Sequence, residues 1–223
     1  VDDGTVWIDL SDGRERVDVI YRRINTEFLD PAAFKTDSVL GIPGLMDAYE
    51  LGNVVIANAP GAGIADDKAL YSYVPDLIEY YLDQEPILPN VKTYLGRKEQ
   101  DRQYILEHAE KLTIKRVDEA GGYGMLIGPR STKSEIESYL EQFRESPQDY
   151  IAQPTINLST HPCLVEETDS FEPRHIDLRP FVLMGQEGPE LVPGGLTRVA
   201  LDRGSLAVNS SQGGGSKDTW VLR

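Results

Sequence analysis

The stretch Leu112–Pro129, LTIKRVDEAGGYGMLIGP, decides how the rest of the chain is interpreted. An alternating β-branched run ends on Lys115, and the apolar run Met125–Ile127 follows a cluster of glycines, so the pattern predicts a strand, a glycine loop and a second strand. Glycines let backbone N–H groups approach an anion closely, and the lysine adds a positive charge. The stretch therefore fits a polyphosphate-binding loop, although a hairpin turn that merely needs glycine explains it equally well.

Two familiar nucleotide-binding motifs are excluded by the surroundings of these glycines. No Gly-Lys-Ser or Gly-Lys-Thr follows them at the start of a helix, as a Walker A loop requires. The stretch leads into a strand, whereas the dinucleotide-binding fingerprint opens a helix.

The composition limits the classes of partner. The chain has 223 residues and a formal net charge of -15, and this field opposes binding to nucleic acid or to an anionic membrane. Cys163 is the single cysteine, which excludes an internal disulfide, and no apolar run is long enough to span a bilayer. We expect a cytoplasmic protein without a nucleic-acid or membrane partner. Because the chain opens on Val1 rather than methionine, we also expect it to be part of a longer protein.

The first third of the chain predicts two paired strands, a helix and a buried strand, over Val6–Leu10, Arg16–Ile24, Pro43–Leu51 and Asn53–Ala59. Arg22 and Arg23 are adjacent on a predicted strand and therefore point to opposite faces, so at most one of them faces a site.

A second glycine-bearing stretch, Pro60–Gly63, precedes Asp66-Asp67-Lys68 and a predicted amphipathic helix, Ala69–Leu82. Either aspartate can cap this helix. Lys68 falls in its first turn, where a cation opposes the helix dipole. Binding of a phosphate and pairing with a neighbouring aspartate both explain a lysine at this place.

The remaining elements form a small α+β unit and a set of strands. The pattern predicts, in order, strand Val91–Leu95, helix Asp101–Leu112, the glycine hairpin, helix Ser131–Glu145 capped by Ser134, and strands Tyr150–Thr155, Arg174–Met184 and Leu196–Leu201. A second glycine-rich turn, Ser210–Ser216, is followed directly by Lys217 and a closing strand at Trp220.

Several long blocks together resemble the circularly permuted type 2 ATP-grasp family, which is related to the synthetase domain of glutathionylspermidine synthase. The blocks are VDVIYRRINTEFLDP (Val17–Pro31), NAPGAGIADDKALYSYVP (Asn58–Pro75), IKRVDEAGGYGMLIGP (Ile114–Pro129), YIAQPTINLSTHP (Tyr150–Pro162), RHIDLRPFVL (Arg174–Leu183), PGGLTRVAL (Pro193–Leu201) and NSSQGGGSKDTWVL (Asn209–Leu222). They cover nearly the whole chain.

The resemblance implies an α+β, ATP-grasp-like fold, in which a small lid unit packs against a larger, mostly antiparallel sheet with flanking helices. It divides the chain into residues 1–90, a lid with the glycine loop over residues 91–152, and residues 153–223. ATP, with Mg²⁺, is expected between the lid and the larger sheet.

The resemblance also assigns roles by position. The implied site residues are Lys68 and Lys115 on the phosphates, Gly121, Gly122 and Gly124 as a flap over them, Gln153 at the hinge beside the adenine, and Arg198 and Lys217 as catalytic cations. Arg179 is a weaker candidate, because Asp177 on the same strand can pair with it.

The chain departs from the family pattern in three ways. Arg116 stands where a proline is expected, and Asn25 stands where an aspartate is expected. The acidic metal-binding block of the family belongs upstream of Val1, so the resemblance covers the C-terminal part of the family unit. We expect contact with that missing segment.

The implied function is the nucleotide-binding part of an ATP-dependent carboxylate–amine ligase that acts through an acyl phosphate on peptide-like or amino-acid substrates. We expect the piece alone to be weakly active or inactive. A non-catalytic ATP-binding or scaffold protein of the same fold is the alternative. A hydrolase is disfavoured, because His108, His161 and His175 have neither nucleophile-elbow nor zinc spacing around them.

Overall fold

The computed structural model describes residues 1–119, 124–165, 169–208 and 214–222. Helices and strands both recur along the chain, which agrees with the α+β prediction. Two compact units are present, Val1–Val74 and Pro75–Arg223, and each is described by itself.

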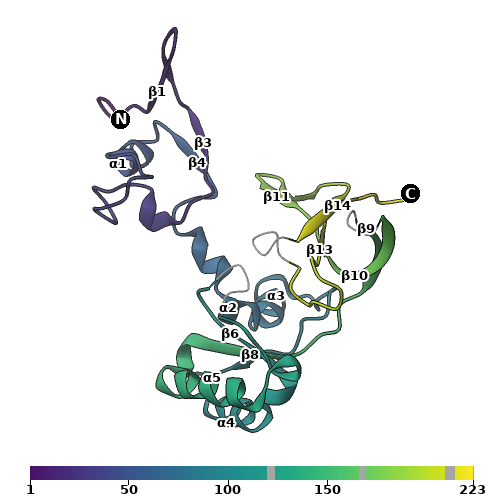
Figure 1. Cartoon of the computed structure of the whole chain (residues 1–223). Helices are drawn as coiled ribbons and strands as arrows, with labels where there is room; N and C mark the ends of the chain where they lie inside the picture. The colour runs from purple at the N-terminus through teal and green to yellow at the C-terminus, as the bar shows by residue number, and fades with distance from the viewer. Residues whose placement is uncertain (120–123, 166–168, 209–213, 223) are drawn as a thin grey trace. The chain divides into compact units, whose positions relative to one another are not determined.

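The N-terminal unit contains a hairpin and a parallel strand pair (Figure 1). Strand β1 (Trp7–Leu10) pairs antiparallel with β2 (Gly13–Arg16), and β3 (Val19–Tyr21) pairs parallel with β4 (Val55–Ala57). The predicted strand Arg16–Ile24 is therefore divided. The division follows from a change of partner, because the Val17 amide donates to Val6 O at 2.9 Å, whereas Asp18 O accepts from the Val55 amide at 2.9 Å.

A small core closes the N-terminal unit around helix α1 (Leu45–Glu50) and the 3₁₀ helix η1 (Thr26–Phe28). The buried members are Val6, Leu29, Leu45, Ala48, Val54 and Ile56. Asp30 is buried beside them, with 1% of its surface exposed, and its carboxylate accepts from the amides of Ala32 (2.8 Å), Gly44 (3.2 Å) and Met46 (3.0 Å). Because Gly44 and Met46 flank the first residue of α1, Asp30 fixes the start of that helix.

The helix predicted over Ala69–Leu82 is two helices. After the 3₁₀ helix η2 (Ala62–Asp66), α2 (Lys68–Tyr71) ends at Tyr71, and α3 (Val74–Leu82) begins three residues later. Pro75 explains the break, because proline has no amide hydrogen for the carbonyl four residues earlier but is tolerated in the first turn of a new helix.

The second unit contains a small antiparallel sheet with the strand order β5-β8-β6-β7. Its strands are β5 (Tyr94–Leu95), β6 (Leu112–Arg116), β7 (Leu126–Ile127) and β8 (Tyr150–Pro154). Thr113 pairs with Ile127 and Ile114 with Leu126, so the predicted strands on the two sides of the glycine stretch form an antiparallel pair.

Two helices, α4 (Glu99–His108) and α5 (Lys133–Glu145), cover one face of this sheet (Figure 1). Ile105, Leu140 and Phe143 from the helices meet Ile114 and Ala152 from the strands in one core. Short 3₁₀ helices, η3 (Ala109–Lys111), η4 (Gly128–Arg130) and η5 (Pro147–Asp149), connect these elements.

The cap of α5 differs from the prediction. Thr132, rather than Ser134, caps the helix, because its hydroxyl accepts from the Glu135 amide at 3.3 Å while the Glu135 carboxylate accepts from the Thr132 amide at 2.6 Å. This reciprocal pair is a capping box.

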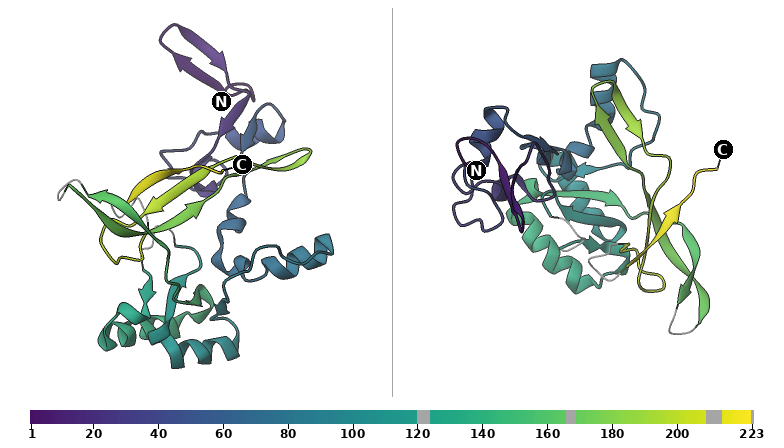
Figure 2. Two further views of the ribbon diagram at one scale, coloured as in Figure 1. Left: turned by 90° about the vertical axis from the view of Figure 1, so that its right-hand side faces the viewer. Right: turned by 90° about the horizontal axis from the view of Figure 1, so that it is seen from above.

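The C-terminal strands form a second antiparallel sheet with the order β14-β13-β10-β9 (Figure 2). Its strands are β9 (Thr160–Val165), β10 (Ser170–Arg179), β13 (Gly195–Val199) and β14 (Gly215–Thr219), and a separate hairpin joins β11 (Val182–Gly185) to β12 (Gly188–Leu191). The strand predicted over Arg174–Met184 is thus two strands, with Pro180 between them. Cys163 is buried on β9, as expected for a small partly apolar side chain.

Within the described ranges, none of the helices has both the length and the apolar character needed to cross a bilayer.

Candidate functional site

The small sheet places two of the predicted nucleotide-binding residues on one face. Lys115 on β6 is opposite Ile151, and Thr113 is opposite Gln153 on β8. Residues directly opposite each other in an antiparallel pair share a face, and residues two apart on one strand do too. Lys115 and Gln153 are therefore diagonal neighbours, on the face opposite to core residues Ile114 and Ala152.

Gln153 is held at the end of β8 by its side chain. Its Nε2 donates to the Thr93 hydroxyl at 2.9 Å, and that hydroxyl donates to Val91 O at 3.0 Å. The side chain of Gln153 is thus engaged by the protein itself.

Of the three predicted flap glycines, Gly124 lies in the described part of the chain, and Gly121 and Gly122 lie outside it. Gly124 has φ +63°, and an added Cβ would overlap the carboxylate of Glu119. Glycine is thus favoured here by the backbone conformation, and an added Cβ would also require the Glu119 side chain to move. The Gly124 carbonyl accepts from the Tyr139 hydroxyl at 2.7 Å.

Arg116, which replaces the expected proline, ties the start of the glycine stretch to its surroundings. Its Nε lies 3.3 Å from both Asp118 Oδ1 and Glu119 Oε1, and its guanidinium lies 5.5 Å from the centre of the Tyr150 ring. The hydrogen bond to Asp118 is the main reason that the pKa of Arg116 is raised above its usual value. Arg116 is thus engaged by carboxylates and a ring.

Lys68 is the first residue of α2 in the N-terminal unit, and Asp67 caps the helix by accepting from the Ala69 amide at 2.7 Å. The predicted place of Lys68 in the first turn is therefore confirmed.

The loop before η2 is held by Arg22. Its guanidinium donates to Asn58 O (2.6 Å), Ile24 O (2.5 Å) and Ala59 O (3.0 Å), and the Asn58 side chain donates back to Arg22 O at 2.9 Å. Asn58 has φ +62°, a conformation that these bonds support. Arg22 is therefore the arginine of the adjacent pair that contacts protein, while Arg23 is exposed.

The two predicted catalytic cations lie on opposite faces of the C-terminal sheet. Arg198 is opposite Ser216 and Asp177, whereas Lys217 is opposite Thr197. Neighbouring residues on a strand point to opposite faces, so Arg198 and Lys217 diverge.

Their surroundings differ as well. The Lys217 ammonium donates to Pro162 O at 2.9 Å. The Nε of Arg198 is buried and has no hydrogen-bond partner within the described residues, which is an arrangement that an anionic ligand would relieve.

Several weaker candidates have structural roles. Arg179 pairs with Asp177 through two contacts of 3.2 and 3.1 Å, which confirms the ion pair predicted for it. His175 Nδ1 lies 2.8 Å from Leu158 O. His161 lies on β9, and its Nδ1 is 2.9 Å from Pro162 O.

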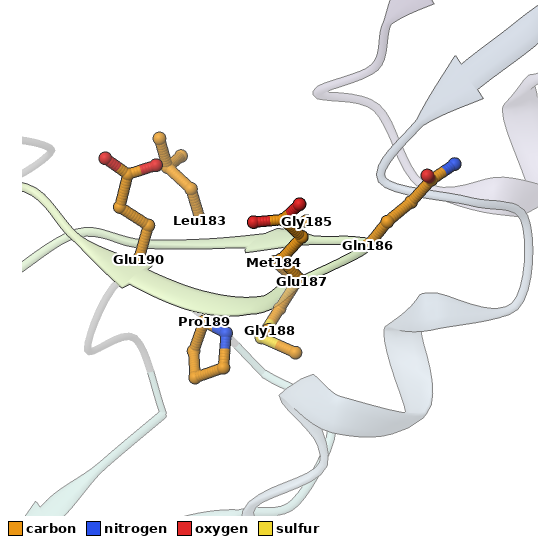
Figure 3. Close-up of a pocket in the computed structure, with 8 residues that line it drawn as sticks. All are labelled: Leu183, Met184, Gly185, Gln186, Glu187, Gly188, Pro189 and Glu190. Carbon is orange, nitrogen blue, oxygen red and sulfur yellow. The ribbon is translucent and has the colours of Figure 1, made fainter.

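A surface hollow on the β11–β12 hairpin contains none of these residues (Figure 3). It is lined by Leu183, Met184, Gly185, Gln186, Glu187, Gly188, Pro189 and Glu190. Glu187 and Glu190 carry negative charge, so this hollow does not suit a polyphosphate.

No group of three or more histidine, cysteine, aspartate or glutamate side chains in the described parts of the chain is arranged to hold a metal ion.

Comparison with known proteins decides the family. The profile of the family "Circularly permuted ATP-grasp type 2" matches residues 1–200. The chain belongs to this family. The predicted resemblance is confirmed, and ATP is the nucleotide that membership of an ATP-grasp family implies.

Relatives extend over the whole chain but are much longer than it. The Synechocystis protein sll0335 is 54% identical over 223 residues, which are 100% of this chain and 46% of that protein. The Mycobacterium tuberculosis protein Rv2411c is 48% identical over 220 residues, 99% of this chain and 40% of that protein. A Frankia alni protein named "Putative glutamate--cysteine ligase 2-3" is 44% identical over 224 residues, 100% of this chain and 25% of that protein. The ATP-grasp chain thus spans less than half the length of each.

Sequence reasoning did not find the contacts of two residues, Arg22 in the first unit and Tyr139 in the second. The alternation rule assigned at most one of the adjacent arginines to a site, but it could not choose between them. The partner of the Tyr139 hydroxyl depends on the pairing of β6 with β7.

Proposed function

We propose that this chain forms the nucleotide-binding part of an ATP-dependent carboxylate–amine ligase. The observation that carries the proposal is the shared face of Lys115 and Gln153 on the small sheet of an ATP-grasp chain. A strand lysine offers a positive charge to phosphates, and the hinge that follows β8 offers backbone donors and acceptors to a base edge. One bound ATP can use both.

In this proposal the other predicted residues complete the phosphate site. Lys68 and Lys115 bind the phosphates, and Gly124, together with Gly121 and Gly122, brings backbone N–H groups to them. Arg198, whose buried Nε has no hydrogen-bond partner among the described residues, stabilises the charge that develops during transfer, and Lys217, which faces the other side of that sheet, is not assigned to the same phosphate. Such fixed cations are the main contribution that a protein makes to phosphoryl transfer.

The proposed chemistry has two steps. A carboxylate oxygen of the acid substrate attacks the γ-phosphorus, and the bond to the leaving ADP oxygen breaks, which gives an acyl phosphate. The nitrogen of the amine then attacks the acyl carbon, phosphate leaves with its electron pair, and the amine proton passes to solvent. The proposed substrates are a carboxylic acid and an amine, each of which is a peptide-like compound or an amino acid. The name of the Frankia relative, which refers to glutamate and cysteine, agrees with this class.

Magnesium would neutralise phosphate charge when bound, and we propose that its carboxylates belong to a longer parent protein. No step of this reaction is assigned to a metal ligand of this chain. The cytoplasm, where ATP is abundant, is the proposed location.

Calorimetric titration with a non-hydrolysable ATP analogue and magnesium tests the proposal. Lys115→Ala removes a charged hydrogen bond worth about 1.5–3 kcal/mol, so we expect the analogue to bind roughly 10 to 150 times more weakly. Lys111→Ala is the matched control, because it also removes a lysine charge. The Lys111 side chain is exposed, and its Nζ lies 3.6 Å from Glu110 Oε1 in a surface ion pair. Equal affinities of the two variants would exclude the assigned role of Lys115.

A second candidate is a nucleotide-binding or scaffold protein without turnover. It is favoured by the divergence of Arg198 and Lys217 across the C-terminal sheet, because two cations on opposite faces do not converge on one phosphate. An assay for ADP release by the longer parent protein, in the presence of ATP and mixed amino acids, distinguishes the ligase from the non-catalytic protein. Binding of the analogue without any ADP release favours this second candidate.

A further inference from the structure

The hydroxyl of Tyr139 joins two segments that are distant in sequence. It donates to Gly124 O at 2.7 Å and lies 3.2 Å from Ile114 O. Ile114 is the residue before Lys115 on β6, and Gly124 is the last residue of the glycine stretch. One phenol on α5 therefore connects the strand that carries the lysine to the end of the glycine stretch.

The ring of Tyr139 is held in place independently of its hydroxyl. It packs edge-on against Tyr150, with ring centres 5.9 Å apart, and it belongs to the partly buried side chains around the core of the small sheet. Aromatic pairs of this geometry have a preferred orientation. Removal of the oxygen alone should therefore leave the ring where it is.

The Tyr139 hydroxyl donates to these two carbonyls, and the Leu126 amide donates a hydrogen bond to it. Burial is the main reason that the pKa of Tyr139 is raised, and electrostatic interactions with Tyr150 and Glu119 raise it further. The phenol thus keeps its proton throughout the neutral range and can donate it to the carbonyl oxygens.

The start of the glycine stretch is fixed by a separate set of contacts. Arg116 pairs with Asp118 and Glu119, and the Glu119 carboxylate occupies the place that a Cβ on Gly124 would take. Glu119, before the glycine stretch, and Gly124, at its end, therefore lie close together. Arg116 contacts Glu119, and Tyr139 contacts Gly124. The spacing between Lys115 and Gly124 depends on both.

We propose that Tyr139 is a positioning residue, which keeps Gly124 in register with Lys115 so that both contact the same phosphate group. The inference rests on the proposed nucleotide site. Tyr139 itself touches neither the nucleotide nor the reacting atoms, and its hydroxyl acts through the Ile114 and Gly124 carbonyls.

The test compares Tyr139→Phe with Tyr104→Phe. Tyr104 lies on α4 of the same unit, stacked on Tyr94 with ring centres 4.3 Å apart, so its variant also loses a phenol oxygen but leaves Gly124 untouched. Amide hydrogen exchange is measured first without nucleotide. One neutral hydrogen bond contributes about 0.5–1.5 kcal/mol, so we expect exchange around residues 124–127 to rise roughly threefold to tenfold in Tyr139→Phe only.

Affinity for the ATP analogue is the second measurement, and it includes the double variant with Lys115→Ala. We expect Tyr139→Phe to weaken binding roughly threefold to tenfold alone. In the Lys115→Ala background it should add little, because residues that act on one contact are not additive. A general loss of stability would weaken both backgrounds equally.

The two failures are distinguishable. If the wild-type chain binds no analogue, the proposed function is wrong, and the exchange comparison still decides whether Tyr139 anchors Gly124. If the analogue binds but Tyr139→Phe changes neither exchange nor affinity relative to Tyr104→Phe, the positioning role is overturned.

Discussion

Replacement of Arg22 by lysine should loosen the loop that precedes Lys68. The guanidinium of Arg22 donates to three carbonyls, on Ile24, Asn58 and Ala59, through three different nitrogens. A lysine ammonium keeps the charge but lacks the planar fork, so it can reach at most one of these carbonyls well.

The expected cost follows from the two lost hydrogen bonds. Bonds from a charged donor contribute about 1.5–3 kcal/mol each when buried, and those to Asn58 and Ala59 are exposed to solvent, which replaces part of the loss. We therefore expect Arg22→Lys to lower the free energy of unfolding of the N-terminal unit by about 1–3 kcal/mol, equivalent to a factor of roughly 5 to 150 in the unfolding equilibrium.

Fluorescence can follow this unit alone. The chain has two tryptophans, Trp7 in the first unit and Trp220 in the second. Trp220 is 85% exposed, so Trp220→Phe should be nearly neutral and should leave Trp7 as the reporter of the first unit. Urea unfolding is then compared in this background.

Arg23→Lys is the matched control, because Arg23 is the adjacent arginine on the same segment and is exposed. Its unfolding midpoint should stay close to that of the parent. If the two lysine variants unfold at the same urea concentration, the three carbonyl contacts contribute no net stability and the reasoning is refuted.

Two further substitutions test other contacts. Asp30→Asn should lower the stability of the first unit by about 1–3 kcal/mol at pH 7, with exposed Asp37→Asn as control. Burial raises the Asp30 pKa, but hydrogen bonds from the amides of Met46, Ala32, Gly44 and Ala33 lower it more, so the net pKa is below the usual 3.8. The Asp30 carboxylate therefore stabilises the fold above pH 3.8, and this stabilisation is lost as the pH falls through the folded pKa. The urea midpoints of wild type and Asp30→Asn should converge below about pH 4, and a difference between them that stays constant with pH would contradict this. Gly96→Ala should cost about 1–3 kcal/mol in thermal unfolding, because the new Cβ meets the Pro147 carbonyl, whereas Gly185→Ala, with its nearest atom 3.8 Å away, should be neutral.

Local patterns predicted the small sheet well. The hairpin around the glycines, the place of Lys115 on a strand, the Asp67 cap and the Arg179–Asp177 pair all depend on residues close together in the sequence. Alternation and capping chemistry act over a few residues, so they can be recognised without knowledge of the fold.

Features that depend on strand partners could not be predicted in the same way. The run Arg16–Ile24 looks continuous, but it changes partner at Asp18. Arg198 and Lys217 fall in similar glycine-bearing blocks, and only the register of β13 with β14 shows that they face opposite sides. The break between α2 and α3 does not depend on a strand partner, because the sequence itself contains a helix breaker there, Pro75.

The buried state of Cys163 makes the chain suitable for site-directed labelling. Its side chain is 6% exposed, and its thiol lies 3.4 Å from His161 O, so it should react slowly with maleimides. Cysteines introduced at exposed Ile64 and Lys111, each four residues before one of the lysines proposed to bind phosphate, would then take spin labels selectively. Electron paramagnetic resonance would report a shorter distance between the labels if an ATP analogue draws Lys68 and Lys115 onto one triphosphate.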